Sequence, residues 1–232
     1  MDFLISPLGW KNWLLLIAAL INLSMAIFIF SRGIKNKVNL YFSLLTFFCF
    51  LWSFSIFGQI VLQSIFWAKF SFQTSFVGAL GIALFLFYFI VYFPFQSVNL
   101  KMSWNYLLWV VAILLSIFSY TKWNLVSFDK DSANQLILGY YVVFQYFYAL
   151  FFVFLVFIAM CLLWSKAKKV ENFLKKDMIF LFWMLLIGLC LGIYFNLFLD
   201  YLGNFKYEWF GPVFTVPMNL AVFYLIFFDR KQ

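Results

Sequence analysis

Charge is scarce in this sequence, and histidine is absent altogether. Only 10% of the 232 residues are charged, whereas 67% are hydrophobic; an average soluble domain has about 25% charged residues. A water-soluble fold of this length cannot grow a core large enough to bury so much apolar surface. Because the same composition excludes disordered, collagen-like and coiled-coil chains, the sequence predicts a protein whose solvent is a lipid bilayer.

The missing histidine also removes several kinds of chemistry. Haem held by paired histidines, histidine-based zinc or di-iron sites and a phospho-accepting histidine are excluded. The cysteines, Cys49, Cys161 and Cys190, lie in apolar runs without a CxxC pair, and we interpret them as buried, small hydrophobic residues. HExxH, GxSxG and P-loop motifs are missing too. We therefore expect no enzyme activity, no cofactor and no bound metal.

Seven apolar stretches are long enough to cross a bilayer, which takes roughly 20 residues of helix. They cover about residues 13–31, 40–61, 72–93, 104–120, 139–164, 178–200 and 210–228. We predict an all-α fold in which residues 1–232 form a single domain, a bundle of seven transmembrane helices. The first stretch is too long for the apolar part of a signal peptide, and its basic residues follow it, so we expect it to be retained.

Lysine and arginine are distributed unequally between the two ends of these stretches. Eleven, including Lys166 and Lys169, fall after the first, third, fifth and seventh stretches, against five at the opposite end. Because cytoplasmic loops are enriched in Lys and Arg, we place the N-terminus outside and the C-terminus in the cytoplasm of a plasma membrane. The net charge of +8 reflects this bias, so we expect the lipid bilayer, and not a nucleic acid, as a partner.

The longest outer connection, residues 121–138, contains a polar centre between two apolar-polar stretches. Residues 124–128 and 135–138 flank Asp129, Lys130, Asp131 and Ser132. Short stretches of this kind around a polar turn favour a β-hairpin. We predict that the hairpin lies on the outer face of the bundle.

Polar residues inside the sixth stretch form a regular row. Gly188, Gly192, Asn196 and Asp200 follow one another at four-residue spacing, which places them on one helical face. The glycines would let a neighbouring helix approach closely, and the same face would point Asn196 and Asp200 into the bundle near its outer end. A carboxylate there is costly unless it is paired or hydrated, which makes Asp200 a candidate site residue; alternatively, it caps the helix end in the headgroup layer.

The first and last stretches each carry an asparagine near mid-membrane. Asn22 lies nine residues after Trp13, and Asn219 lies eight residues after Gly211, so both are about 12–14 Å below the outer interface at 1.5 Å per residue. If the helices close into a ring, these amides become neighbours and hydrogen-bond, which stabilises a helix pair by roughly 1 kcal/mol. We predict this packing role for both, and a kink at Pro217.

Further polar groups gather toward the outer end of several stretches, where they predict a ligand pocket with aromatic walls. Trp52 lies in the middle of the second stretch, where its indole N–H needs a partner or a cavity. The alternative is that each polar residue only marks a helix end. The candidate ligand-binding residues are Trp52, Gln59, Gln73, Gln145, Asn196 and Asp200, with Glu208 beside them.

Two short motifs add a resemblance. The basic connection after the first stretch runs into NLYFSLL at residues 39–45, followed by LWS at 51–53, and the last stretch runs from FGPV at 210–213 to YLIFFDR at 224–230. With the outside start and the outer segment before the fifth stretch, these motifs resemble the N-terminal seven-transmembrane sensor region of bacterial histidine kinases. The chain departs from that family in having no histidine to phosphorylate and no ATP-binding domain.

The resemblance implies a sensory input module that binds a small ligand from the outer side and signals to a partner. That partner would be a cytoplasmic or membrane protein, including a second copy of the chain. Two alternatives remain open from the residues alone. One is a small transporter or channel component, although ion-coupled transport needs buried ionisable groups. The other is a non-catalytic accessory subunit of another membrane protein.

Overall fold

The computed structural model describes residues 9–96, 98–122, 124–130, 136–140, 142–170, 172–199 and 207–227. Within them, seven helices are long and apolar enough to cross a membrane, as the sequence predicts. They are α1 (Trp10–Ser31), α2 (Lys37–Val61), α3 (Ile65–Tyr92), α4 (Met102–Ser119), α5 (Val142–Ala167), α6 (Asn172–Ile193) and α8 (Phe210–Phe227). A short π-helix, η1 (Tyr194–Phe198), continues α6 directly.

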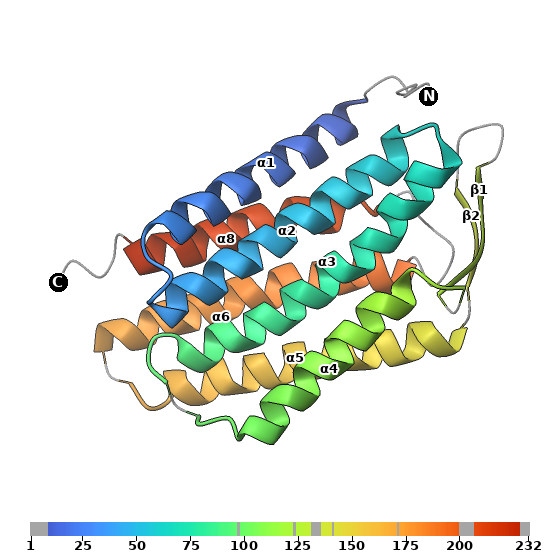
Figure 1. Ribbon diagram of the computed structural model, residues 1–232. Coiled ribbons are helices and arrows are strands. Elements are labelled where there is room, and N and C mark those ends of the chain that lie inside the picture. Colours follow the sequence, from blue (N-terminus) through green and yellow to red (C-terminus); the bar gives the residue numbers. More distant parts are fainter. Residues whose placement is uncertain are drawn as a thin grey trace.

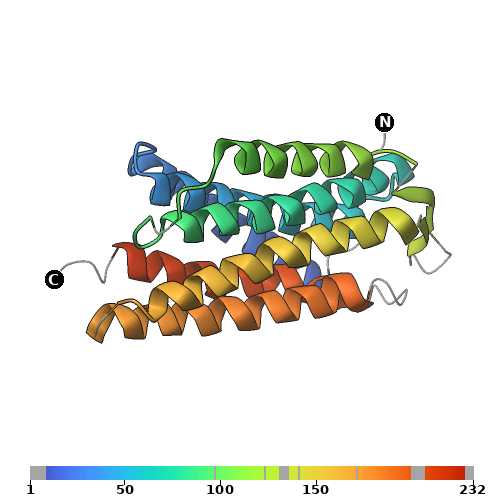
Figure 2. The ribbon, with the colours of Figure 1, turned by 90° about the horizontal axis from the view of Figure 1, so that it is seen from below.

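The helices run up and down along one common direction and form a single bundle (Figure 1). α3 is the central helix. In its most apolar 18-residue segment 78% of the residues are buried in the protein, against 11% in the corresponding segment of α4. α4 lies on one face of the bundle and α6 on the opposite face (Figure 2). Cys49 is buried in the bundle as expected, whereas Cys161 and Cys190 are exposed on its surface, so the prediction of three buried thiols was wrong for two of them.

Several helix boundaries differ from the predicted ones. α3 begins at Ile65, not near residue 72, because its first turns carry Lys69 and Gln73 without ending the helix. α5 begins at Val142 because the residues before it belong to a strand. α6 begins at Asn172, so the basic segment before residue 178 is largely helical.

The predicted hairpin is confirmed. β1 (Leu125–Lys130) pairs antiparallel with β2 (Leu136–Tyr140), with Phe128 opposite Leu138; its turn lies outside the described residues. Asn124 anchors this region, since its Nδ2 donates to the Ser119 carbonyl oxygen at 3.0 Å and its Oδ1 accepts from Gln145 Nε2 at 2.9 Å. The hairpin is therefore tied both to the end of α4 and to the start of α5.

The helix pair α2 and α3 approaches closely at glycines that the sequence analysis did not single out. A Cβ atom at Gly78 would lie 2.8 Å from the backbone nitrogen and Cα of Trp52, and one at Gly81 would lie 1.9 Å from the Phe48 ring. Because the contact at Gly78 is with backbone, no side-chain rotation relieves it. Gly78 therefore sets the distance between the two helices where α2 carries Trp52.

The first and last helices lie side by side, which closes the ring (Figure 1). Asn219 Nδ2 donates to Asn22 Oδ1 at 2.8 Å, and Asn22 Nδ2 donates to Thr215 Oγ1 at 2.8 Å. Both asparagines are fully buried. The expected bond between the two amides is therefore present, and it links α1 to α8 near the middle of the bundle. Pro217 lies inside α8 between two members of this network.

Lys166, which the sequence analysis counted as a loop charge, is a buried residue of the core. Its side chain is only 1% exposed. Nζ donates to the carbonyl oxygens of Ile90, Val91, Phe93 and Phe95 at 2.5–2.9 Å. The last carbonyls of a helix have no intrahelical donor, so Lys166 of α5 satisfies the end of α3 and the turn that follows it.

Candidate ligand cavity

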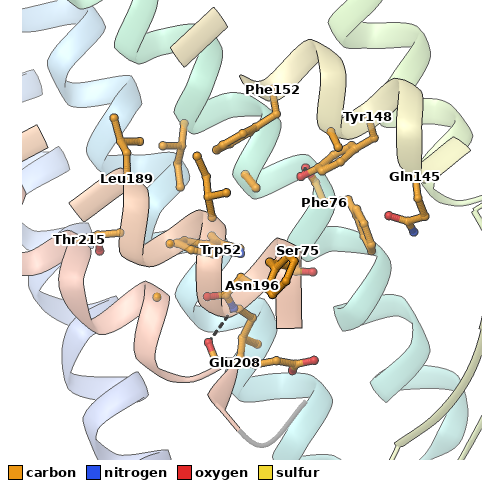
Figure 3. Close-up of a pocket in the computed structure, with 18 of the residues that line it drawn as sticks. Trp52, Ser75, Phe76, Gln145, Tyr148, Phe152, Leu189, Asn196, Glu208 and Thr215 are labelled. Atoms are coloured by element: carbon orange, nitrogen blue, oxygen red, sulfur yellow. Dashed lines mark hydrogen bonds between the residues drawn. The ribbon is translucent and has the colours of Figure 1, made fainter. Parts of the chain in front are cut away.

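A cavity of about 680 Å³ lies between α2, α3, α5, α6 and α8, toward the end of the bundle where α5 and α8 begin (Figure 3). Its size is within the range of about 300–1,000 Å³ typical of small-molecule sites. Most of the lining is apolar, with a small number of polar side chains. The polar lining residues are Gln59, Ser75, Gln145, Asn196, Glu208 and Thr215, to which the tyrosines 146 and 148 add their hydroxyl groups.

The lining changes character along the bundle axis. On α3 the lining runs from Phe72 to Ile82, and on the opposite side it runs from Phe198 of η1 to Gly188 of α6. At 1.5 Å per residue each path covers about 15 Å. Gln59, Ser75, Gln145, Asn196 and Glu208 all lie at the end near the start of α5 and α8, whereas Ile82, Phe152, Leu189 and Met218 line the deeper end. The cavity is therefore amphipathic, polar at its mouth and apolar at depth.

Glu208 is the polar centre of the mouth. Its side chain is 2% exposed, and its Oε2 accepts a hydrogen bond from Gln59 Nε2. Its backbone oxygen accepts from Asn196 Nδ2 at 2.7 Å (Figure 3). Glu208 thus joins α2 to η1 just before α8 begins.

Two amide oxygens at the mouth are buried without a hydrogen-bond partner among the described residues: Gln59 Oε1 and Asn196 Oδ1. The orientation of both amides follows from their other contacts, because an ionised carboxylate and a backbone carbonyl can only accept. Each amide must therefore turn its NH₂ group toward Glu208, which leaves its oxygen facing elsewhere. A buried acceptor of this kind costs about 1–3 kcal/mol, so it marks a place where a donor would be stabilising.

The π-helix positions Asn196. Residues 194–198 form a single wide turn in place of an α-helical one, a feature frequent at functional sites. A Cβ atom at Gly211 would lie 1.9 Å from Asn196 Oδ1, so only glycine at the start of α8 leaves room for this amide. The same Cβ would also lie 3.1 Å from Trp52 Cη2, which brings the indole to the same place.

The glycine row of α6 has two different roles. A Cβ at Gly188 would lie 3.3 Å from Met218 Sδ, so this glycine faces α8 at close range, as expected. At Gly192 an added Cβ would meet only Trp52 Cη2, at 3.8 Å. The expected close helix contact at Gly192 was therefore wrong: both glycines line the cavity, and Gly192 leaves space for the indole.

Aromatic side chains form the wall on the side of α3 and α5. The Phe76 ring meets the Phe72 ring at 5.3 Å and the Tyr148 ring at 5.1 Å, both edge to face. Figure 3 shows Phe76, Tyr148 and Phe152 facing the cavity opposite Asn196 and Glu208. Nothing local in the sequence distinguishes these residues from the many other aromatic residues of the chain, so their place in the cavity could not be predicted from it.

The structure brings most of the candidate site residues together. Trp52, Gln59, Gln145 and Asn196 all line the cavity. Gln73 is buried in α3 but does not line it, because it lies on another face of the helix than Ser75. The position of Asp200 is outside the described residues, and its role stays a prediction.

Fold and cavity together define a multi-pass helical membrane protein with an internal chamber at one end. The chain matches, over residues 14–230, the family described as the N-terminal 7TM region of histidine kinase. It belongs to this family, as the sequence resemblance indicated, and is thus a membrane sensory input module of the plasma membrane. The matched region is the input part of such kinases, not their catalytic part. No curated protein matches the chain significantly.

Proposed function

We propose that this input module binds a small ligand in the cavity from the outer side of the membrane and transmits its occupancy through α8. The observation that carries the proposal is that α8 takes part in both tasks. Gly211, Thr215 and Met218 of α8 line the cavity, and the same helix runs from there to the opposite end of the bundle (Figure 1).

Thr215 supports a route for this signal. Its side chain lines the cavity, and its Oγ1 accepts the hydrogen bond from Asn22 of α1. A ligand that displaces Thr215 would also change the contact between α1 and α8. Coupling of this kind needs an element that both events bias, and α8 is the element that meets this requirement.

The proposed orientation, with the N-terminus outside, follows from the basic residues and makes the cavity accessible from the outer side. The last turn of α8 then lies at the cytoplasmic face. Arg32, Lys37 and Lys168, three of the basic residues on which the proposed orientation rests, lie at this end of the described helices. The proposed receiver of the signal is a cytoplasmic or membrane partner, including a second copy of the chain.

Retention of a natural ligand tests the proposal. The wild-type protein is extracted from its native membrane into lipid nanodiscs, and its bound small molecules are measured by native mass spectrometry. Gly192→Leu fills the cavity, since only the Trp52 ring lies within 4 Å of an added Cβ. Cys190→Leu is the matched control, because Cys190 is exposed on the surface of the same helix.

We expect a compound that is retained by the wild type and by Cys190→Leu but lost from Gly192→Leu. Equal retention by all three proteins would contradict the proposal. Solute flux through proteoliposomes that carry the wild-type protein, abolished by Gly192→Leu, would instead support a transporter.

A further inference from the structure

We propose that the ligand is an amphiphile with a protonated amine head and a short apolar tail, and that it enters from the outer leaflet between α5 and α6. This inference rests on the proposed function, because it concerns the same cavity. It goes further in naming the chemistry of the ligand and its route.

The mouth of the cavity offers hydrogen-bond acceptors. Gln59 Oε1 is buried with no donor among the described residues, and its amide is held in that orientation by the bond to Glu208. Asn196 Oδ1 is likewise without a donor beside Gly211. A head group that brings N–H donors would satisfy such oxygens, whereas a carbonyl or carboxylate head group would add a further acceptor.

The charge of the cavity lining also favours a head group that carries N–H donors. Among the described lining residues, Glu208 is the only aspartate, glutamate, lysine or arginine. It lies at the mouth and is 2% exposed, where a low local dielectric strengthens attraction to a cation and repulsion of an anion. An ammonium has three donors and no acceptor, which fits a carboxylate beside an orphaned amide oxygen.

The aromatic wall favours a cation as well. Phe76 of α3 and Tyr148 of α5 lie on the side of the cavity opposite Glu208 (Figure 3), and the Phe72 ring packs against Phe76 at 5.3 Å. Ring faces attract a cation within about 6 Å, and more strongly once it is desolvated. An ammonium held at the mouth would therefore have a carboxylate on one side and aromatic rings on the other.

The depth of the cavity fits a short apolar tail. Below the polar mouth the lining is formed by Ile56, Ala79, Ile82, Phe152 and Leu189. Mouth and chamber together extend over about 15 Å along the helix axes. An alkyl tail in this chamber would exchange contacts with lipid tails for contacts with apolar side chains, so it would remain in an apolar environment.

The route follows from the two helices that flank the mouth. The Trp164 ring, near the end of α5, lies 5.0 Å from the Phe182 ring in the middle of α6, and the two helices diverge toward the mouth (Figure 2). Tyr146 of α5 and Phe198 of η1 line the cavity and are also 59% and 53% exposed. The cavity therefore reaches the lipid-facing surface between these side chains, which is an entrance suited to a membrane-dissolved amphiphile.

Photolabelling with simple amphiphiles tests the inference. Octylammonium, octanol and octyl sulfate, each with a diazirine in the alkyl chain, are added to the protein in nanodiscs of zwitterionic lipid. Cross-linked residues are mapped by peptide mass spectrometry, and affinity is measured by competition with the unlabelled compound. A parallel sample with phosphatidylethanolamine in the nanodisc distinguishes a lipid amine, which would compete, from a free amine.

The variants separate charge from structure. Glu208→Gln keeps the volume and the ability to accept from Gln59 but removes the charge, and Asp177→Asn makes the same change at the other end of α6. We expect octylammonium to label the lining residues of α5 and α6. Its affinity should fall tenfold or more in Glu208→Gln, which corresponds to about 1.4 kcal/mol, and stay unchanged in Asp177→Asn. Octanol should bind both variants as it binds the wild type.

The outcomes also distinguish this inference from the proposed function. Equal affinity for octylammonium and octanol, or no effect of Glu208→Gln, would overturn the amine assignment while leaving the cavity as a binding site. Stronger binding of octyl sulfate would overturn it too. If none of the three compounds labels the cavity and Gly192→Leu changes nothing, the proposed function itself fails.

Discussion

Replacement of Lys166 by methionine should destabilise the protein strongly, although the sequence places this residue among ordinary loop charges. Methionine keeps an unbranched apolar stem but removes all donors from the carbonyl oxygens of Ile90, Val91, Phe93 and Phe95. A buried acceptor without a donor costs about 1–3 kcal/mol. Removal of the buried ammonium, which is itself costly to desolvate, offsets part of this loss.

The net effect should be about 3 kcal/mol in the free energy of unfolding, which lowers Tm by roughly 6–12 °C for a chain of this size. Lys168→Met is the matched control: Lys168 is exposed, and its Nζ lies 5.5 Å from the Trp164 ring centroid, a contact worth about 0.5–1 kcal/mol. Thermal unfolding of both variants in the same detergent measures the difference. Equal Tm values for the two variants would refute the role assigned to Lys166.

Three further predictions concern packing and topology. Asn219→Leu should lower stability by about 1–3 kcal/mol, because it leaves the side-chain oxygen of Asn22 on α1 buried without its donor; unfolding in detergent checks this. Gly78→Ala should destabilise the protein far more than Gly192→Ala, since only the Cβ added at Gly78 would meet backbone atoms, at 2.8 Å. Equal Tm values for the two variants would contradict this. In a cysteine-free background, an impermeant thiol reagent on intact cells should label Asp129→Cys but not Lys169→Cys, and the reverse would overturn the orientation.

Depth in the membrane could be predicted from the sequence, because rise per residue is fixed. Counting inward from each interface placed Asn22 and Asn219 at the same level, and the two amides do bond. The side of a helix on which a residue faces the cavity was harder to predict than its depth. Gln73 and Ser75 have nearly the same depth, yet only Ser75 lines the cavity, because the neighbours of α3 decide which face lines an internal space.

The row on α6 was predicted correctly as far as Asn196, because Gly188, Gly192 and Asn196 all line the cavity, whereas the local shape of the helix was not. Four-residue spacing assumes an α-helix throughout, whereas residues 194–198 form a π-helix that adds a residue to the turn. The position of the Asn196 side chain in this π-helix depends on Gly211 of α8, because any larger residue there would collide with the amide. Lys166 was misread similarly: the positive-inside rule counts charges by loop and contains no information on whether a side chain folds back under a neighbouring helix.

The central claim is that occupancy of the cavity moves α8, and a distance across the cytoplasmic end of the bundle tests it most directly. After replacement of the three native cysteines, two of which are exposed, nitroxide labels at Tyr224→Cys of α8 and Met102→Cys of α4 report this distance by double electron–electron resonance. Both labelled positions are exposed. Octylammonium should shift the distance distribution in the wild-type background and leave it unchanged in Gly192→Leu. An unchanged distribution in the wild type, at a concentration where photolabelling shows the cavity to be filled, would contradict the account.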